Sequence, residues 1–352
     1  MFQPTFALAN QGSSAILIDF DSGEILFEKE PYEKRYPAST TKIMTLILIY
    51  EALNDGSLHY DDMVVASSYA ASMGGSQIYL KEGESMSVEE LLKGIVIGSG
   101  NDACVALGEY ISGTISEFVV AMNKKAKALK LKNTNFTNCT GLHDDQHYTC
   151  AYDLGMMAKY LLKIGGEDLL KYTTLKEDYI RNNEFWLVNT NKLLSKDSMI
   201  TGLKTGYTKE AKYCLVATAT KNNQTMISVI LGEPKANIRN DESYELLKYG
   251  FSQYKQEVLF EANSVIETID LPLIKEKSVD LYTKEDIVIS IKKDQEVNKE
   301  YEIDLLKSVD FECDEHIANI ITNNQTFPLY ASNSGTSLTF FEKVFEMFLK
   351  LI

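Results

Sequence analysis

The chain has 352 residues, of which 45% are hydrophobic and 24% charged, so it is a folded globular protein long enough for two domains. Its formal net charge of -15 argues against a nucleic-acid partner, because a nucleic-acid surface needs clustered Lys and Arg. The four histidines and five cysteines show no metal-ligand spacing, and we expect no metal and no other cofactor.

Hydrophobic patterning in the first half of the chain predicts a β-hairpin followed by helices. Residues 15–19 and 25–27 are apolar runs on either side of a turn at Asp21-Ser22-Gly23, as in a hairpin. Pro37 is favourable at the start of a helix, and residues 43–53 are apolar on nearly every face, which predicts a buried helix. Further helical patterns cover residues 88–97, 103–111, 118–130 and 152–162.

Strand patterns return after residue 199. Residues 213–220 and 226–231 predict two strands joined by a turn over 221–224, and residues 243–251 predict a closing helix. The expected fold of the first 250 residues is therefore α+β, with helices packed on an antiparallel sheet that is built from both ends of the segment.

The hydrophobic pattern changes again near residue 255, where apolar residues begin to recur at every second position. This pattern predicts a small all-β domain. We expect an N-terminal stub, an α+β domain, the β-rich domain, and a linker with a final helix. Their ranges are 1–12, 13–252, 253–332 and 333–352. The stub is either the remnant of an export signal or an expression start placed after one.

The final helix is expected over residues 338–352 and is amphipathic. Its apolar face carries Phe341, Val344, Phe345, Phe348, Leu349 and Ile352. Such a face either packs on the protein core or lies in a membrane surface. Its position after the linker, at the end of the chain, favours the membrane.

The cysteines are too few and too scattered for a disulfide scaffold. We expect most of them to be free, buried thiols. Cys139 and Cys150 flank one polar loop, and a disulfide between them is the alternative.

The first chemically informative motif is Ser39-Thr40-Thr41-Lys42. On a helix, Ser39 and Lys42 project from the same face, so the lysine amine can reach the serine hydroxyl. A serine becomes a nucleophile when a neighbour takes its proton, and a lysine can do so if burial or a second cation lowers its pKa. The alternative is an ordinary serine in the first turn of a helix.

Two further motifs supply the other groups that acyl transfer needs. Ser99-Gly100-Asn101 lies between two helical patterns, where the serine can relay a proton and the asparagine can bind a substrate amide. Lys204-Thr205-Gly206 precedes a strand and offers a cation and a hydroxyl to a carboxylate, while Gly206 lets a substrate backbone approach. Each could be a plain turn, but their ordered conjunction favours a serine acyl-transfer site.

With these motifs, residues 13 to about 251 resemble the low-molecular-mass penicillin-binding proteins of the serine peptidase S11 family, which are D-alanyl-D-alanine carboxypeptidases. The resemblance implies a penicillin-binding and β-lactamase-like fold for this domain. The segments that carry it are 36–45, 98–103, 135–136, 141–142, 189–194, 202–208, 213–219, 231–233 and 249–251.

The resemblance also implies a role for each site residue. Ser39 is acylated, Lys42 accepts its proton, and Ser99 passes a proton toward the leaving D-alanine. The substrate-binding residues are Asn101 for the amide, Lys204 and Thr205 for the terminal carboxylate, Gly206, Tyr207 for the oxyanion hole, and Arg239. The oxyanion hole would combine the backbone N–H groups of Ser39 and Tyr207, and Arg239 is either near the carboxylate or a surface arginine.

Two positions depart from the family pattern. Lys212 stands where the resemblance implies glycine, and Tyr152 stands where it implies a basic residue. Lys212 lies beside the expected active-site strand, where it could alter rate or access.

The resemblance implies that the substrate is the peptidoglycan pentapeptide stem, cleaved through an acyl-enzyme that water hydrolyses. β-Lactams would acylate Ser39 because they mimic the D-alanyl-D-alanine terminus. We expect the protein at the extracytoplasmic face of a bacterial cytoplasmic membrane. The alternatives are a D,D-endopeptidase, a β-lactamase, or a non-catalytic protein that senses penicillin or binds peptidoglycan.

Overall fold

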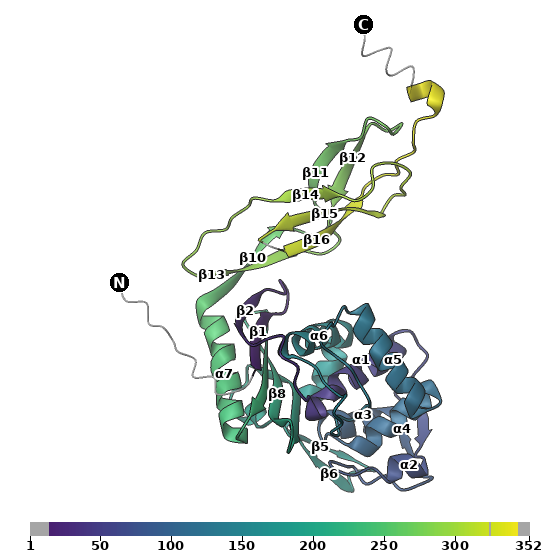
Figure 1. The fold of residues 1–352 in the computed structure, drawn as a ribbon, viewed down its shortest axis with the longest axis vertical. Coiled ribbons are helices and arrows are strands. Elements are labelled where there is room, and N and C mark those ends of the chain that lie inside the picture. Colours follow the sequence, from purple (N-terminus) through teal and green to yellow (C-terminus); the bar gives the residue numbers. More distant parts are fainter. Residues whose placement is uncertain (1–13, 324, 344–352) are drawn as a thin grey trace. The chain divides into compact units, whose positions relative to one another are not determined.

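A computed structural model describes residues 14–323 and 325–343, and the chain divides after Ser252 into two compact units (Figure 1). The first unit contains the three motifs. Most of the expected final helix, residues 344–352, lies outside the described residues, as does the N-terminal stub.

The first unit is built on an antiparallel sheet with strand order β2-β1-β9-β8-β7. Its strands are β1 (Ser14–Asp19), β2 (Ile25–Lys29), β7 (Ile200–Thr208), β8 (Lys212–Lys221) and β9 (Gln224–Glu233). The pairing of β1 with β9 joins the two ends of the unit, as the sequence predicts. Within the described residues β7 is an edge strand, so its outer edge borders the site described below.

Helices cover both faces of this sheet (Figure 1). On one face, a Cβ added to Gly155 of α6 (Ala151–Thr173) would lie 2.5 Å from Ile18 Cδ1. On the other, a Cβ added to Gly250 of α7 (Ala236–Gln253) would lie 3.1 Å from Leu17 Cδ2. Neighbouring residues of β1 thus face opposite layers, and a glycine in each helix allows close packing.

The helical layer surrounds α1 (Lys42–Asn54), which is almost completely buried as expected from its apolar sequence. The other helices of this layer are α2 (Ser68–Ala71), α3 (Val88–Val96), α4 (Asn101–Ser112) and α5 (Ile115–Ala128). A 3₁₀ helix over Ala38–Thr41 precedes α1, so Ser39 lies in a tighter turn than the regular α-helix that its sequence suggests.

Several short elements have too few residues for a recognisable period, and the sequence did not predict them. They are the hairpin β3 (Met63–Val65) and β4 (Ser85–Ser87), the hairpin β5 (Glu177–Ile180) and β6 (Phe185–Val188), and the 3₁₀ helix Lys192–Ser195. α6 is longer than its predicted pattern and contains a break at Gly166, where φ is 46°.

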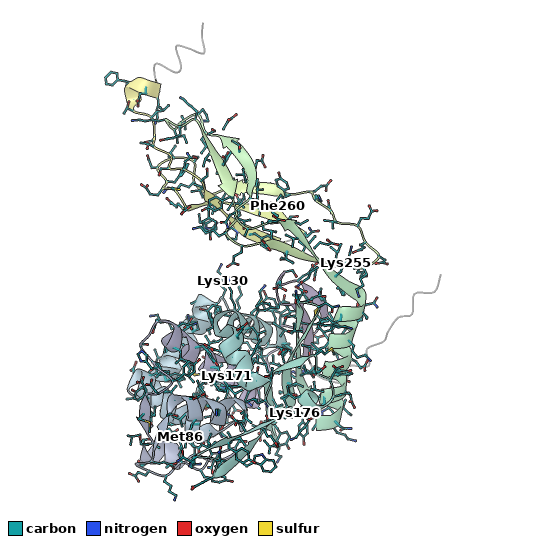
Figure 2. All side chains as sticks on the ribbon, turned by 180° about the vertical axis from the view of Figure 1, so that it is seen from behind. Met86, Lys130, Lys171, Lys176, Lys255 and Phe260 are labelled. Carbon is teal, nitrogen blue, oxygen red and sulfur yellow. The ribbon has the colours of Figure 1, made fainter. Side chains whose placement is uncertain are left out.

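The second unit is a β-sheet domain with its own apolar core, as predicted. Its strands are β10 (Tyr254–Phe260), β11 (Val265–Asp270), β12 (Ser278–Tyr282), β13 (Ile287–Lys292), β14 (Glu302–Leu305), β15 (His316–Thr322) and β16 (Gln325–Ala331). Strands β11-β12-β16-β15-β14 form one sheet and β10-β13 another. Figure 2 labels Lys255 and Phe260 on β10. A helical turn starts at Phe340 and continues to Lys343, where the described residues end.

Among the described residues, no single helix has the length and apolar character to cross a membrane. The pair α4 and α5 passes the same test jointly, but its two helices are bent by 85° at their junction.

Candidate active site

The fold brings the three motifs to one place, between the helical layer and the edge strand β7. Ser39 comes from the 3₁₀ helix, Lys42 is the first residue of α1, and the Ser99-Gly100-Asn101 turn joins α3 to α4. A Cβ added to Gly206 would lie 2.9 Å from Pro37 O and 3.0 Å from Ser39 N. The glycine therefore lets β7 pack directly against the backbone of the serine.

Lys42 has no exposed surface, and its amine is surrounded by three oxygen atoms. Nζ lies 2.6 Å from Asn101 Oδ1, 2.9 Å from Thr140 O and 3.0 Å from Ser39 Oγ. A neutral amine has two N–H groups and one lone pair. Because the two carbonyl oxygens can only accept, they take both N–H groups, and the lone pair of a neutral Lys42 is left for the Ser39 hydroxyl.

Burial also disfavours the charged form of the two lysines in the site. It lowers the pKa of Lys42 from its ordinary value of 10.5, and it lowers the pKa of Lys204 well below that value. The charge of Lys42 further lowers the pKa of Lys204. Desolvation is the main cause of both shifts, and Lys204 is not among the groups that lower the pKa of Lys42, so the expected role of Lys204 as a second cation acting on Lys42 is not seen.

The Ser99-Gly100-Asn101 turn is rigidly held. Asn101 donates from Nδ2 to Gly74 O at 2.7 Å while its Oδ1 accepts from Lys42, so it positions the lysine as well as facing the site. Ser99 is 3% exposed with φ of 61°, and its hydroxyl makes no hydrogen bond to another described residue. Asp102 accepts from the backbone N–H groups of Ile78 and Leu80, which fixes the start of α4.

The Lys204-Thr205-Gly206 motif, which is expected to bind a carboxylate, lies on β7, and its lysine side chain is buried. Lys204 is 1% exposed, and Nζ donates to Thr205 O at 3.2 Å. Thr205 Oγ1 donates to Thr190 Oγ1 at 2.7 Å. Tyr207 is 57% exposed, and its ring packs on Tyr213 with 4.4 Å between ring centroids.

Arg239 lies on α7 and reaches β8 rather than β7. Its Nη1 donates to Cys214 O at 3.2 Å, and its guanidinium lies 5.9 Å from the ring centre of Tyr213. It is 5% exposed and therefore not a surface arginine. Its charge contributes to the lowered pKa of Lys204, after burial and the charge of Lys42.

A loop that received no role from the sequence completes the site. Thr140 supplies one acceptor for Lys42, and next to it Gly141 has φ of 84°. His147 Nδ1 accepts from Thr137 N at 3.0 Å, so the ring proton is on Nε2, which donates to Thr41 Oγ1 at 2.8 Å. Burial lowers the pKa of His147 to about 4, which keeps the ring neutral. The Asn-x-x-Gly turn at 138–141 was the available signal, but such turns are common.

The two departures from the family pattern have different settings. Lys212 has φ of 57°, in the left-handed region that glycine adopts easily, and it begins β8. Tyr152 packs against Tyr32, with 5.2 Å between ring centroids.

The cysteines and acidic residues do not form a metal centre in the described part of the chain. No group of three His, Cys, Asp or Glu side chains there could hold an ion. Cys139 and Cys150 are both free and buried, so the alternative disulfide is absent from the structure.

The chain is similar to known proteins over most of its length. The Peptidase S11 family, described as D-alanyl-D-alanine carboxypeptidase, matches residues 3–235. The D-alanyl-D-alanine carboxypeptidase DacF of Bacillus subtilis (strain 168) is 48% identical over 297 residues, which cover 84% of this chain and 76% of the relative.

Solved structures agree with this likeness. Penicillin binding protein 5 from Haemophilus influenzae matches with a TM-score of 0.81 and 30% identity, covering 96% of this chain and 100% of that one. Penicillin-binding protein D2 from Listeria monocytogenes, solved in its ampicillin-bound form, matches with a TM-score of 0.64 and 27% identity, covering 70% of this chain and 100% of that one.

Gly141→Ala should destabilise the protein and slow the acylation of Ser39. An added Cβ would lie 1.8 Å from Ala38 O, so the turn that carries the serine must move. We expect a loss of roughly 1–3 kcal/mol or more of unfolding free energy from this overpacking, measured by urea denaturation.

Gly113→Ala is the matched control. Gly113 has φ of 78°, but no atom lies within 4 Å of an added Cβ, so this variant carries the backbone strain without the clash. Equal losses of stability and of acylation rate in the two variants would contradict the packing role of Gly141.

Proposed function

The chain belongs to the Peptidase S11 family of D-alanyl-D-alanine carboxypeptidases, and we propose that it removes the terminal D-alanine from peptidoglycan stem peptides through an acyl-enzyme on Ser39. The observation that carries this proposal is the position of Lys42. Its amine lies 3.0 Å from Ser39 Oγ while Asn101 and Thr140 hold its other hydrogen-bonding positions.

In the acylation step, Ser39 Oγ attacks the carbonyl carbon of the penultimate D-alanine and its proton passes to Lys42 Nζ. The negative charge that develops on the carbonyl oxygen accepts hydrogen bonds from the backbone N–H groups of Ser39 and Tyr207. The close packing of Gly206 against Ser39 N supports this pairing, because Tyr207 is the next residue along β7.

Collapse of the tetrahedral intermediate breaks the C–N bond and releases D-alanine. Ser99 relays the proton from Lys42 to the leaving amine, a role that its buried hydroxyl, without another partner in the described chain, can take. Water then attacks the ester carbonyl and gives a proton to the neutral Lys42, which passes it to Ser39 Oγ as the ester bond breaks. These transfers leave the enzyme unchanged and consume one water.

The C-terminal carboxylate of the substrate binds at Lys204 and Thr205. Burial disfavours the charged form of an isolated Lys204, and a bound carboxylate restores it by pairing with the ammonium. This requirement for a free carboxylate selects the end of a peptide. β-Lactams carry a carboxylate beside a strained amide, so we propose that they acylate Ser39, as supported by the ampicillin-bound form of the Listeria relative.

We also propose that the protein acts at the extracytoplasmic face of the cytoplasmic membrane, with residues 338–352 against the lipid surface. The proposed substrate is part of the cell wall, and the start of this segment is strongly apolar. Phe340 and Phe341 are 74% and 83% exposed, so both side chains are available to contact a bilayer.

Ser39→Ala should abolish covalent labelling by a fluorescent penicillin, because the proposed acyl bond forms on Ser39 Oγ. The same variant should release no D-alanine from diacetyl-Lys-D-Ala-D-Ala. Labelling is measured on a denaturing gel, with Ser68→Ala, an exposed serine of α2, as the control.

Undiminished labelling of the Ser39→Ala variant would refute the acyl-enzyme. Labelling of the wild type without release of D-alanine would indicate a penicillin-sensing protein, and rapid turnover of penicillin would indicate a β-lactamase.

The rate of acylation by penicillin should rise with pH as Lys42 loses its proton. Burial lowers the pKa of Lys42, so the midpoint of this rise should lie below the ordinary 10.5. Burial lowers the pKa of Lys204 well below 10.5 as well, so the rate should fall again once both lysines are neutral and no ammonium remains to bind the carboxylate. Stopped-flow measurement of second-order acylation rates against pH gives both limbs.

Lys42→Arg should lower acylation by about 10² to 10⁴-fold, because a guanidinium keeps its proton and cannot act as the base. A rate independent of pH up to 10.5, or an arginine variant with normal acylation, would contradict the role of Lys42.

Deleting residues 338–352 should move the protein from the membrane fraction to the soluble fraction of expressing cells, since the apolar face would be lost. Labelling by penicillin should persist in the truncated chain. Fractionation that is identical for both chains would instead favour packing of this segment on the protein.

A further inference from the structure

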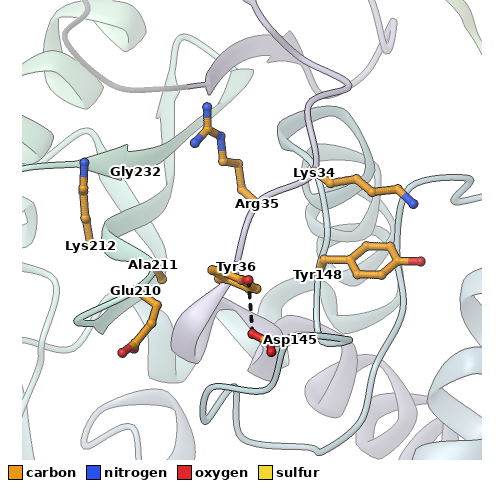
Figure 3. A pocket seen from close by; sticks show the side chains of 9 residues that line it. All are labelled: Lys34, Arg35, Tyr36, Asp145, Tyr148, Glu210, Ala211, Lys212 and Gly232. Atoms are coloured by element: carbon orange, nitrogen blue, oxygen red, sulfur yellow. Dashed lines mark hydrogen bonds between the residues drawn. The ribbon is translucent and has the colours of Figure 1, made fainter.

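A pocket of about 350 Å³ lies at the turn between β7 and β8, beside the segment that leads into Ser39 (Figure 3). Residues 34–36 form one wall, residues 210–212 of the turn form another, and Asp145 and Tyr148 come from the loop after the active site. The mechanism above uses none of these side chains.

The pocket lies on the same face of the sheet as Ser39. Cys214 Sγ is 3.9 Å from Tyr36 O, and Cys214 lies directly opposite Gly206 in the pairing of β7 with β8. Directly opposed residues point to the same face of a sheet, and Gly206 faces the Ser39 backbone. The turn of residues 208–211 is closed by a hydrogen bond from Ala211 N to Thr208 Oγ1 at 3.0 Å.

The proposed binding mode directs the substrate toward this pocket. The carboxylate is held at Lys204 and Thr205, and the reacting carbonyl lies at Tyr207, so earlier residues of the peptide run on past Thr208. An extended chain advances about 3.3 Å per residue. The residue before the two D-alanines therefore lies beside the turn, and its side chain can reach the pocket.

The charged side chains of the pocket are of both signs. Lys34, Arg35 and Lys212 are cationic, and Asp145 and Glu210 are anionic. Figure 3 shows the charged ends of Arg35 and Lys212 toward one end of the pocket, and those of Asp145 and Glu210 toward the other.

Several of these charges are incompletely matched. Lys212 and Glu210 are exposed and have no ion-pair partner within 4 Å among the described residues, although Lys212 lies close enough to Glu233 for its charge to lower the pKa of that carboxyl. Arg35 pairs with Glu33, but its buried Nε–H has no hydrogen-bond partner in the described chain. Asp145 Oδ1 has two distant partners, the Tyr36 hydroxyl and His143 Nε2, each at 3.5 Å. Lys34, in contrast, is already placed 4.2 Å from the ring centre of Tyr148.

We propose that this pocket is a substrate subsite for the stem residue that precedes D-alanyl-D-alanine, and that it takes a long side chain ending in both an ammonium and a carboxylate. The inference rests on the proposed function, because it uses the same peptide orientation. Arg35 and Lys212 bind the carboxylate, and Asp145 and Glu210 bind the ammonium. Lys212 stands at a position where the resemblance implies glycine.

The test compares release of D-alanine from three acetylated peptides X-D-Ala-D-Ala. X is a diaminopimelyl residue, whose side chain carries both charges, lysine, which lacks the carboxylate, or norleucine, which lacks both. We expect kcat/KM to fall roughly fivefold at each loss of a charge, the effect of one charge-assisted contact.

Variants test which end of the pocket binds the carboxylate of the substrate side chain and which end binds its ammonium. Lys212→Gln and Arg35→Gln should each bring the diaminopimelyl-to-lysyl ratio toward one, and Glu210→Gln should do the same for the lysyl-to-norleucyl ratio. Lys209→Gln is the matched control, because it removes a cation from the same turn but does not line the pocket. Its ratios should equal those of the wild type.

Equal kcat/KM for the three peptides would overturn the subsite, as would ratios that are unchanged in the Lys212, Arg35 and Glu210 variants. Cleavage of the norleucyl peptide shows that each variant is folded. Absence of D-alanine release from every peptide would overturn the proposed function itself, whereas release without discrimination would overturn only the subsite.

Discussion

The desolvation of Lys42 is the constraint on which the rest of the site depends. A fully buried amine is held to a narrow set of positions, since its hydrogen-bonding capacity must be met by protein atoms. Asn101 Oδ1 and Thr140 O meet two of the three positions, and the third is Ser39 Oγ. The same burial that favours the neutral amine therefore aims its lone pair at the nucleophile.

Segments far apart in the sequence must converge for this to work. α1 supplies the lysine, α4 supplies Asn101, the 138–141 loop supplies Thr140, and β7 closes the site from the sheet side. Two glycines allow the approach, because a side chain at Gly141 would meet Ala38 O and one at Gly206 would meet Pro37 O and Ser39 N. Ala38, the residue before Ser39, has φ of 48°, and Ser99 itself has φ of 61°. The backbone at these two positions is therefore held in a sparsely populated region by its surroundings.

The sequence was sufficient to predict the parts of this arrangement that rest on local spacing. A buried apolar helix, strands of clear alternation, and a serine three residues before a lysine each leave a periodic signal. The roles of Thr140 and His147 leave none, because a backbone carbonyl belongs to every residue and a single histidine in a polar loop has many uses. Nor does any pattern within the Ser-Gly-Asn turn indicate that Asn101 binds Lys42 and Gly74 O before a substrate arrives.

The two buried lysines also influence each other's protonation, because an ammonium on one disfavours an ammonium on the other. Two ammonium groups in one desolvated site repel each other, and the charge of Lys42 lowers the pKa of Lys204. In the binding mode that we propose, an arriving carboxylate pairs with Lys204 and stabilises the ammonium there, and that charge in turn would disfavour a second ammonium at Lys42. Binding of the correct terminus thus favours the protonation state in which Lys42 is a base. A ligand without the carboxylate would not stabilise the ammonium of Lys204 and would not favour the neutral form of Lys42. Recognition of a free C-terminus and activation of Ser39 would therefore be linked through one pair of side chains.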